Sequence, residues 1–187
     1  ASIKLTLAQS CEDAAELEHI HHEIENLLIE ANEKVGLLSF ETGSSTLYRL
    51  GLREAVEELC ERMAQRYRVR FAVESDNIAE KIDDACATVL FKSVRELLFN
   101  VVKHADVKQA TVSIHQKSNG LELTVTDHGT GFPQRLEGQD LSGINNLGLG
   151  LFGIQERMRD INGTMRVKSE PNAGTQVTLW TPTQSCG

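Results

Sequence analysis

The chain has 187 residues, of which 40% are hydrophobic and 25% are charged, as in a soluble globular protein rather than a disordered or membrane-spanning one. Its net charge of −8 argues against a nucleic-acid partner, because binding a phosphate backbone requires clustered Lys and Arg side chains. No apolar run is long enough to span a membrane and the first residues lack the pattern of a signal peptide, so we expect a cytoplasmic chain without membrane contact. The cysteines stand singly, which predicts reduced, partly buried thiols.

The first quarter of the chain is acidic and helical in pattern. Residues 1–47 contain nine acidic side chains against two lysines, and apolar residues recur at steps of three and four. This pattern predicts a long helix from about Ala14 to Phe40, after a shorter segment that ends near Ser10. The small polar stretch at residues 42–46 predicts a hinge, and we place a domain boundary between residues 46 and 47.

The remaining elements alternate between helix and strand. Periodicity predicts helices at residues 52–67, 83–105 and 149–161, and strands at 69–73, 110–114, 121–125, 164–167 and 175–180. Asn119 and Gly120 supply the turn of a hairpin between the second and third strands. The βαββαββ order predicts an α+β fold, a two-layer sandwich with helices on one face of a mixed, mostly antiparallel sheet.

An acidic residue ends the third predicted strand. Strict alternation places Asp127 on the same face as Leu123 and Val125, so its carboxylate points into the apolar layer. An aspartate at this position often only caps a turn. Here Gly129 and Gly131 follow at once, where the backbone must turn sharply or approach a ligand closely.

Glycine is concentrated downstream of this aspartate. Seven of the chain's 14 glycines fall within residues 129–153, which indicates a ligand-facing loop. Gly148, Gly150 and Gly153 match a dinucleotide fingerprint by letter, but no strand precedes them, and no Walker lysine is present. A glycine-rich entry to a helix still suits phosphate, because free N–H groups and the positive dipole end face the ligand.

Polar residues form one stripe of the helix predicted at residues 83–105. Glu96, Asn100, Lys103 and His104 lie opposite the apolar face, as a solvated surface would. The alternative is a phosphate site, since an Asn oxygen suits Mg²⁺ and a Lys suits phosphate charge.

These segments together resemble a known family. The stretch from Glu96 to Ala105 resembles the N box of the GHKL ATPase superfamily, residues 127–132 its G1 box, and Gly148, Gly150 and Gly153 its G2 box. Gly174 and Thr175 resemble its late Gly-Thr element. The closest similarity is to sensor histidine kinases of the NarX/DesK type, and residues 47–59 resemble that group's junction between dimerisation helices and catalytic domain.

The resemblance implies a Bergerat fold that binds ATP and Mg²⁺. Asp127 would accept a hydrogen bond from the adenine amino group, and Asn100 would hold Mg²⁺. Glu96 would act at the γ-phosphate and is also a candidate metal ligand. The remaining implied contacts are Lys103 and His104 with phosphate oxygens, Gly129 and Gly131 in the adenine pocket, Gly148, Gly150 and Gly153 near the phosphates, Thr175 beside the base, and residues 132–147 as a lid.

The implied activity is transfer of the ATP γ-phosphoryl group to a histidine and onward to a response regulator, in a homodimer formed by the N-terminal helices. The parent protein would be anchored in the bacterial inner membrane. Residues 1–46 then form a partial dimerisation region in which the acceptor-histidine helix is mostly absent, so we expect ATP binding without self-phosphorylation. His19, His21 and His22 lack the acceptor's flanking pattern, and we interpret them as solvated rather than as metal ligands.

Two positions depart from the family pattern, and three alternative functions stay open. His128 stands where this group often has Asn, and Arg135 is the lone cation of the lid segment. The alternatives are an anti-sigma-type serine kinase, an ATP-gated clamp, and a regulatory module that has lost catalysis.

Overall fold

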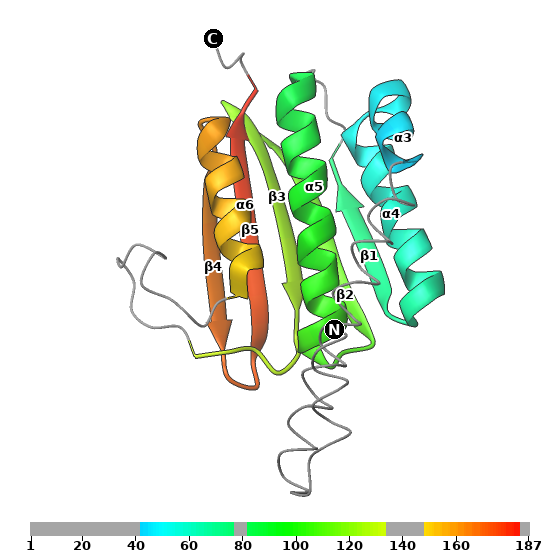
Figure 1. Ribbon diagram of the computed structural model, residues 1–187, viewed down its shortest axis with the longest axis vertical. Helices are drawn as coiled ribbons and strands as arrows, with labels where there is room; N and C mark the ends of the chain where they lie inside the picture. The colour runs from blue at the N-terminus through cyan, green and yellow to red at the C-terminus, as the bar shows by residue number, and fades with distance from the viewer. Residues whose placement is uncertain (1–41, 77–81, 134–147, 184–187) are drawn as a thin grey trace, which may run out of the picture. The chain divides into compact units, whose positions relative to one another are not determined.

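The computed structural model describes residues 42–76, 82–133 and 148–183 (Figure 1). The chain divides into two compact units, Ala1–Thr42 and Gly43–Gly187. The long helix predicted at residues 14–40, its three histidines and most of the predicted lid lie outside the described residues.

The second unit contains each helix and strand that the sequence predicts between residues 52 and 180. The bounds are α3 Thr42–Leu50, α4 Leu52–Tyr67, β1 Arg70–Ser75, α5 Asp84–Asn100, η1 Val101–Ala105, β2 Gln109–Lys117, β3 Gly120–Asp127, α6 Gly148–Asp160, β4 Thr164–Glu170 and β5 Gly174–Pro182.

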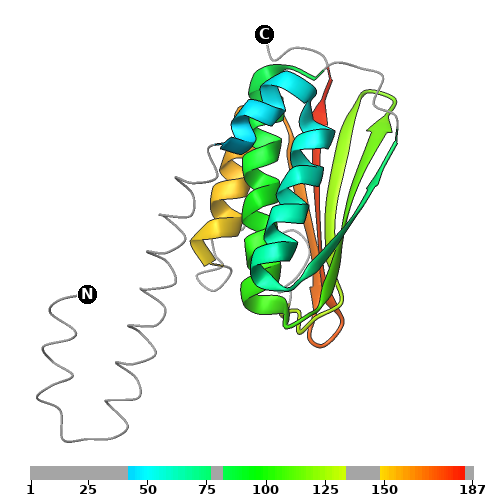
Figure 2. The same ribbon diagram turned by 90° about the vertical axis from the view of Figure 1, so that its right-hand side faces the viewer.

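The strands form one five-stranded sheet in the order β1-β2-β3-β5-β4. Strand β1 pairs parallel to β2, because α5 carries the chain across between them, and the other three pairings are antiparallel. Figure 2 shows the helices stacked on one face of this sheet. The predicted α+β two-layer sandwich is confirmed.

The core fills the space between the helices and the sheet. Strand β3 alternates between buried and half-buried residues, and its buried side chains meet those of α5. Each fully buried aliphatic side chain contributes about 1.5–3 kcal/mol relative to exposure. The largest of these side chains are Met63, Leu90, Leu98, Ile114, Leu121, Leu123, Ile154, Met158 and Leu179.

The loop conformation predicted for residues 42–46 is wrong, because this stretch forms the first turns of α3, whereas the division of the chain into two units falls within it, between Thr42 and Gly43. Leu47 is only 6% exposed, and the Thr46 hydroxyl donates a hydrogen bond to Glu58 of α4 at 2.5 Å. The chain turns instead at Gly51, whose φ of 108° lies in the region that favours glycine. Composition favoured a loop here, but contacts with α4 stabilise a helix.

The helix predicted at residues 83–105 changes its hydrogen-bonding pattern near its end. The Asp83 side chain caps its start by accepting a hydrogen bond from the Ala85 N–H at 3.1 Å. After Asn100 the helix widens into the π-helical turn η1, a rare form that is frequent at functional sites.

Cys60 and Cys86 are free and buried, as predicted. Burial raises the pKa of the Cys60 thiol to about 12, and the nearby Glu57 and Glu61 carboxylates act in the same direction. This thiol is therefore protonated and unreactive at neutral pH. None of the helices within the described ranges has the length and apolar character needed to cross a membrane.

Candidate functional site

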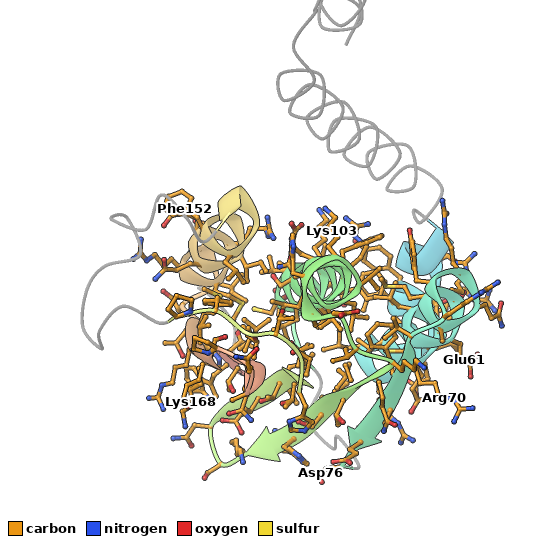
Figure 3. The ribbon with its side chains drawn as sticks, turned by 90° about the horizontal axis from the view of Figure 1, so that it is seen from below. Glu61, Arg70, Asp76, Lys103, Phe152 and Lys168 are labelled. Carbon is orange, nitrogen blue, oxygen red and sulfur yellow. The ribbon has the colours of Figure 1, made fainter. Side chains whose placement is uncertain are left out.

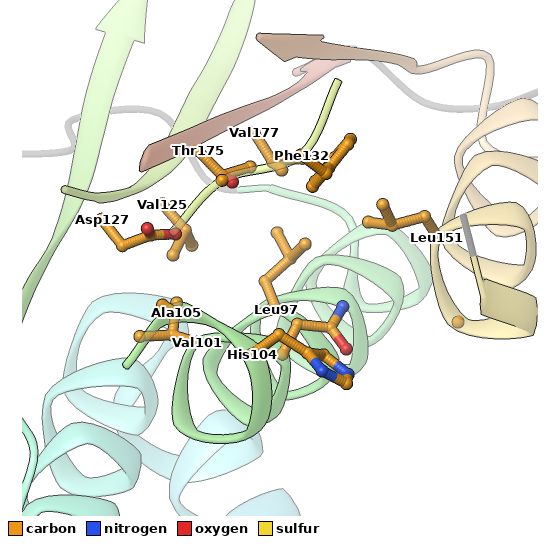
Figure 4. A pocket seen from close by; sticks show the side chains of 13 residues that line it. Leu97, Val101, His104, Ala105, Val125, Asp127, Phe132, Leu151, Thr175 and Val177 are labelled. Carbon is orange, nitrogen blue, oxygen red and sulfur yellow. The ribbon is translucent and has the colours of Figure 1, made fainter. Parts of the chain in front are cut away.

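A cavity of about 380 Å³ lies between the helical layer and the sheet. Its volume is at the lower end of the roughly 300–1,000 Å³ of small-molecule sites. The walls come from α5, η1, β3, β5, the start of α6 and the segment after β3 (Figure 4). The cavity is therefore built from segments far apart in the sequence.

Most of the wall is apolar. Side chains from α5 and η1 face side chains from the sheet across the cavity, as Figure 4 shows for Leu97 and Val101 opposite Val177. Two apolar surfaces facing each other suit a flat aromatic group, because both of its faces then lose contact with water. The apolar lining residues are Leu97, Val101, Ala105, Val125, Phe132, Leu151 and Val177.

Asp127 supplies a carboxylate to this apolar wall. It is 6% exposed, and its Oδ1 accepts a hydrogen bond from the Gly129 N–H at 2.9 Å. Among the described residues no hydrogen-bond donor reaches Oδ2. Because Asp127 lines the cavity and its Oδ2 is an acceptor without a donor there, the cavity is suited to a ligand that donates a hydrogen bond at this point.

The loop after Asp127 is fastened to the end of η1. The Thr130 hydroxyl donates to the His104 carbonyl at 2.6 Å, and the Thr130 N–H donates to the Ala105 carbonyl at 3.0 Å. Gly129 lies so close to the Ala105 carbonyl oxygen that no Cβ would fit. Gly129 thus packs against the helix end, whereas Gly131 lines the cavity. Sequence reasoning missed Thr130, whose role depends on this tertiary contact.

A buried serine on β4 organises the opposite wall. Ser169 Oγ accepts a hydrogen bond from the Phe132 N–H at 2.9 Å and lies 3.0 Å from the Thr175 hydroxyl oxygen. It also donates to the Gly174 carbonyl at 3.1 Å. Thr175, which is paired with Asp127 in the sheet register, lines the cavity. Ser169 was not predicted, because a serine on a strand carries no distinctive pattern.

Asn100 and His104 form the polar part of the helical wall. Partial burial lowers the pKa of His104 from its ordinary value, and the neighbouring Lys103 charge lowers it further. The imidazole is therefore neutral at pH 7, with a ring nitrogen available as an acceptor or a donor.

The other predicted residues differ in whether they line the cavity. Gly150 lines the cavity, and a Cβ on it would meet Glu96 Oε1 at 2.7 Å, so the start of α6 packs on Glu96. Lys103 is exposed on the helical side of the molecule (Figure 3). Glu96, Lys103, Gly129 and Gly153 are not among the lining residues, and Gly148 is the first residue of α6.

Residues 86–185 match the family described as histidine kinase-, DNA gyrase B-, and HSP90-like ATPase. The chain belongs to this ATPase family. The resemblance predicted from Glu96, Asp127 and Gly150 and their neighbours is thereby confirmed.

Histidine kinases are similar to this chain both in sequence and in structure. The oxygen sensor histidine kinase NreB of Staphylococcus carnosus (strain TM300) is 33% identical over 180 residues, 96% of this chain and 50% of that protein. The chain thus spans about half the length of this curated relative. The similarity to NreB is consistent with the predicted NarX/DesK subtype.

Two solved structures share the fold. Acinetobacter baumannii histidine kinase AdeS matches with a TM-score of 0.59 at 12% identity, over 97% of this chain and 96% of that chain. The catalytic domain of histidine kinase ThkA matches with a TM-score of 0.58 at 19% identity, over 71% of this chain and 91% of that chain. The α+β fold is that of histidine kinase catalytic domains.

Proposed function

We propose that this chain is the ATP-binding catalytic region of a sensor histidine kinase, which transfers the ATP γ-phosphoryl group to a histidine and onward to a response regulator. The Asp127 carboxylate is the observation that carries the proposal. Its Oδ2 atom is an acceptor that has no donor among the described residues, and the residue lies at one side of an apolar cavity. Adenine fits both features, since its ring is flat and its amino group donates a hydrogen bond.

The same carboxylate gives a reason for base selectivity. Guanine carries a carbonyl where adenine carries its amino group, so two acceptors would face each other across the pocket. The Asp127 Oδ2 atom would then stay without a donor, and GTP would be rejected.

Asn100 and Glu96 would lie at the phosphate end of the site. The Asn100 amide oxygen is a ligand type that Mg²⁺ prefers, and bound Mg²⁺ would neutralise phosphate charge. Within the described ranges no group of three or more His, Cys, Asp and Glu side chains could hold a metal ion by itself. Mg²⁺ would be bound chiefly through substrate phosphates and water, with Asn100 as a protein ligand and Glu96 as a further candidate.

Each side chain of the site would contribute by positioning. Asp127 and the apolar walls would orient the base, while Lys103 and His104 would bind phosphate oxygens from the helical side. Gly148, Gly150 and Gly153 would let the α6 backbone approach the phosphates, and Glu96 would orient the accepting group. Phosphoryl transfer depends mainly on such alignment and charge neutralisation.

The rest of the parent protein follows from the same proposal. Residues 1–46 would belong to the dimerisation and phosphotransfer region, through which the full-length protein would form a homodimer, and residues 47–187 to the catalytic domain. The partner would be the receiver domain of a response regulator, and a membrane anchor would lie elsewhere in the parent.

The test follows labelled phosphate from Mg-[γ-³²P]ATP to protein. The chain is mixed with a helical dimer that carries an acceptor histidine, and then with a receiver domain. We expect an acid-labile, alkali-stable phosphohistidine that is lost on adding the receiver, and neither product with Asn100→Ala. Acid-stable phosphoserine would instead support the serine kinase. Binding of ATP without any transfer would support a clamp or regulatory module.

A further inference from the structure

The hydrogen bonds of Ser169 fix the direction of its hydroxyl proton. The residue is 3% exposed, so its partners must come from the protein. Its Oγ accepts a hydrogen bond from the Phe132 N–H at 2.9 Å and donates its proton to the Gly174 carbonyl at 3.1 Å. A hydroxyl has one proton and two lone pairs, so a lone pair is left for the Thr175 hydroxyl, whose oxygen is 3.0 Å away. Thr175 is therefore the donor in the bond between the two side chains.

The Thr175 hydroxyl then presents only an acceptor to the cavity. Its single proton lies on the bond to Ser169, and its lone pairs remain for a ligand. Thr175 lines the cavity directly opposite Asp127 in the register of β3 and β5 (Figure 4). The Cβ atoms of such a pair lie about 4.5–5.5 Å apart. Both acceptors can thus serve the same edge of one ligand, directly or through a water molecule.

Two neighbouring acceptors discriminate between bases more strictly than one. Adenine brings an amino group to this wall, whereas a base with a carbonyl there would face the oxygens of both Asp127 and Thr175. A threonine hydroxyl without a fixed partner can turn its proton to suit its surroundings, and would then donate to such a carbonyl. The bond to Ser169 prevents this adaptation.

We propose that Ser169 is a positioning residue for base selectivity, which holds the Thr175 hydroxyl so that the sheet wall of the cavity offers only acceptors to the base. The inference rests on the proposed function. Ser169 does not line the cavity itself, so it acts on the ligand through Thr175. This gives a role to a buried serine that lies behind the cavity wall.

The experiment compares ATP with ITP, whose base carries a carbonyl in place of the adenine amino group. Calorimetry with Mg²⁺ gives the Kd of both nucleotides for wild type, Ser169→Ala, Ser169→Cys, Thr175→Val and the double variant Ser169→Ala/Thr175→Val. Thr178→Val is the matched control, because Thr178 lies on the same strand and its hydroxyl oxygen is 3.1 Å from that of Thr124, outside the cavity. Thermal unfolding of each nucleotide-free protein shows that it is folded.

We expect Ser169→Ala to lower the ATP-to-ITP affinity ratio by about 2- to 12-fold, the factor of one neutral hydrogen bond, through tighter binding of ITP. Ser169→Cys should cause a smaller change in the same direction, because a thiol is a weak acceptor of similar size. In the Thr175→Val background, Ser169→Ala should leave the ratio unchanged, since there is no hydroxyl to orient. Loss of the bond to the Phe132 N–H should weaken both nucleotides equally and leave the ratio as it was. Thr178→Val should keep the wild-type ratio.

An unchanged ratio in both Ser169→Ala and Ser169→Cys overturns the inference. An equal change of the ratio in the presence and absence of the Thr175 hydroxyl also overturns it, because Ser169 would then act on the shape of the site and not through Thr175. Wild type that binds ATP and ITP equally well overturns the inference but leaves phosphoryl transfer from ATP open to its own test. Wild type that binds neither nucleotide overturns the proposed function together with it.

Discussion

The Asp127→Asn variant tests adenine recognition directly, because the structure fixes how the new amide must lie. Asp127 Oδ1 accepts a hydrogen bond from the Gly129 N–H at 2.9 Å. An asparagine keeps this bond if its carbonyl oxygen takes that place. Its NH₂ group then points into the cavity, where Oδ2 stood, and opposes the amino group of adenine.

The expected loss is that of one hydrogen bond to a charged acceptor. Such bonds contribute about 1.5–3 kcal/mol, which corresponds to a Kd for ATP about 10- to 150-fold weaker. The new amide donor also faces the position of the guanine carbonyl, so affinity for GTP should rise. Calorimetric titration of both nucleotides into both proteins measures the change in the ATP-to-GTP ratio.

Glu122→Gln is the matched control for this experiment. It makes the same change from carboxylate to amide on the same strand, at a side chain that pairs with Lys117 at 3.2 Å outside the cavity. ATP affinity of Asp127→Asn within twofold of wild type would refute the reasoning, provided that the variant unfolds at the wild-type temperature.

Four further variants test the pH dependence and the packing. Nucleotide phosphates should raise the depressed pKa of His104, so ATP should bind more tightly as pH falls from 8 to 6. For one proton, the affinity changes by at most about tenfold per pH unit. In calorimetry, His104→Asn should remove this pH dependence. The depressed pKa also means that His104 lowers folding stability below pH 6.5, which pH-dependent unfolding of the same pair checks. Gly129→Ala should destabilise the fold by about 1–3 kcal/mol in urea titration, because its Cβ would collide with the Ala105 carbonyl, whereas Gly153→Ala should be tolerated. Ser93→Ala should stabilise by about 1 kcal/mol, since its buried hydroxyl lacks a partner among the described residues; lower stability would reveal one.

The parts of the fold predicted from sequence are those with a strong local pattern. Strict alternation along β3 was enough to place Asp127 among the buried residues, and the periodicity at residues 52–67 matches α4 residue for residue. Both patterns can be read from the sequence because each side chain along the element faces either the core or water.

The parts that sequence missed depend on partners distant in the chain. The stretch at residues 42–46 is polar and small, yet it is helical because Thr46 and Leu47 meet the α4 side of the core. Ser169 and Thr130 became visible as site residues only through Thr175 and His104, which lie on other segments. The residues of the N, G1 and G2 boxes could be identified from the sequence, but the hydrogen bonds that join these segments could not.

The π-helical turn η1 restricts how this segment can change in evolution. Loss of one residue from Val101–Ala105 would shorten the wide turn to an ordinary α-helical one and change the position of the carbonyls that this turn presents. The carbonyls of His104 and Ala105 would then leave Thr130, and the aspartate loop would lose its attachment. The number of residues between Asn100 and β2 is therefore constrained independently of their side chains, and a deletion here should be harder to tolerate than most substitutions.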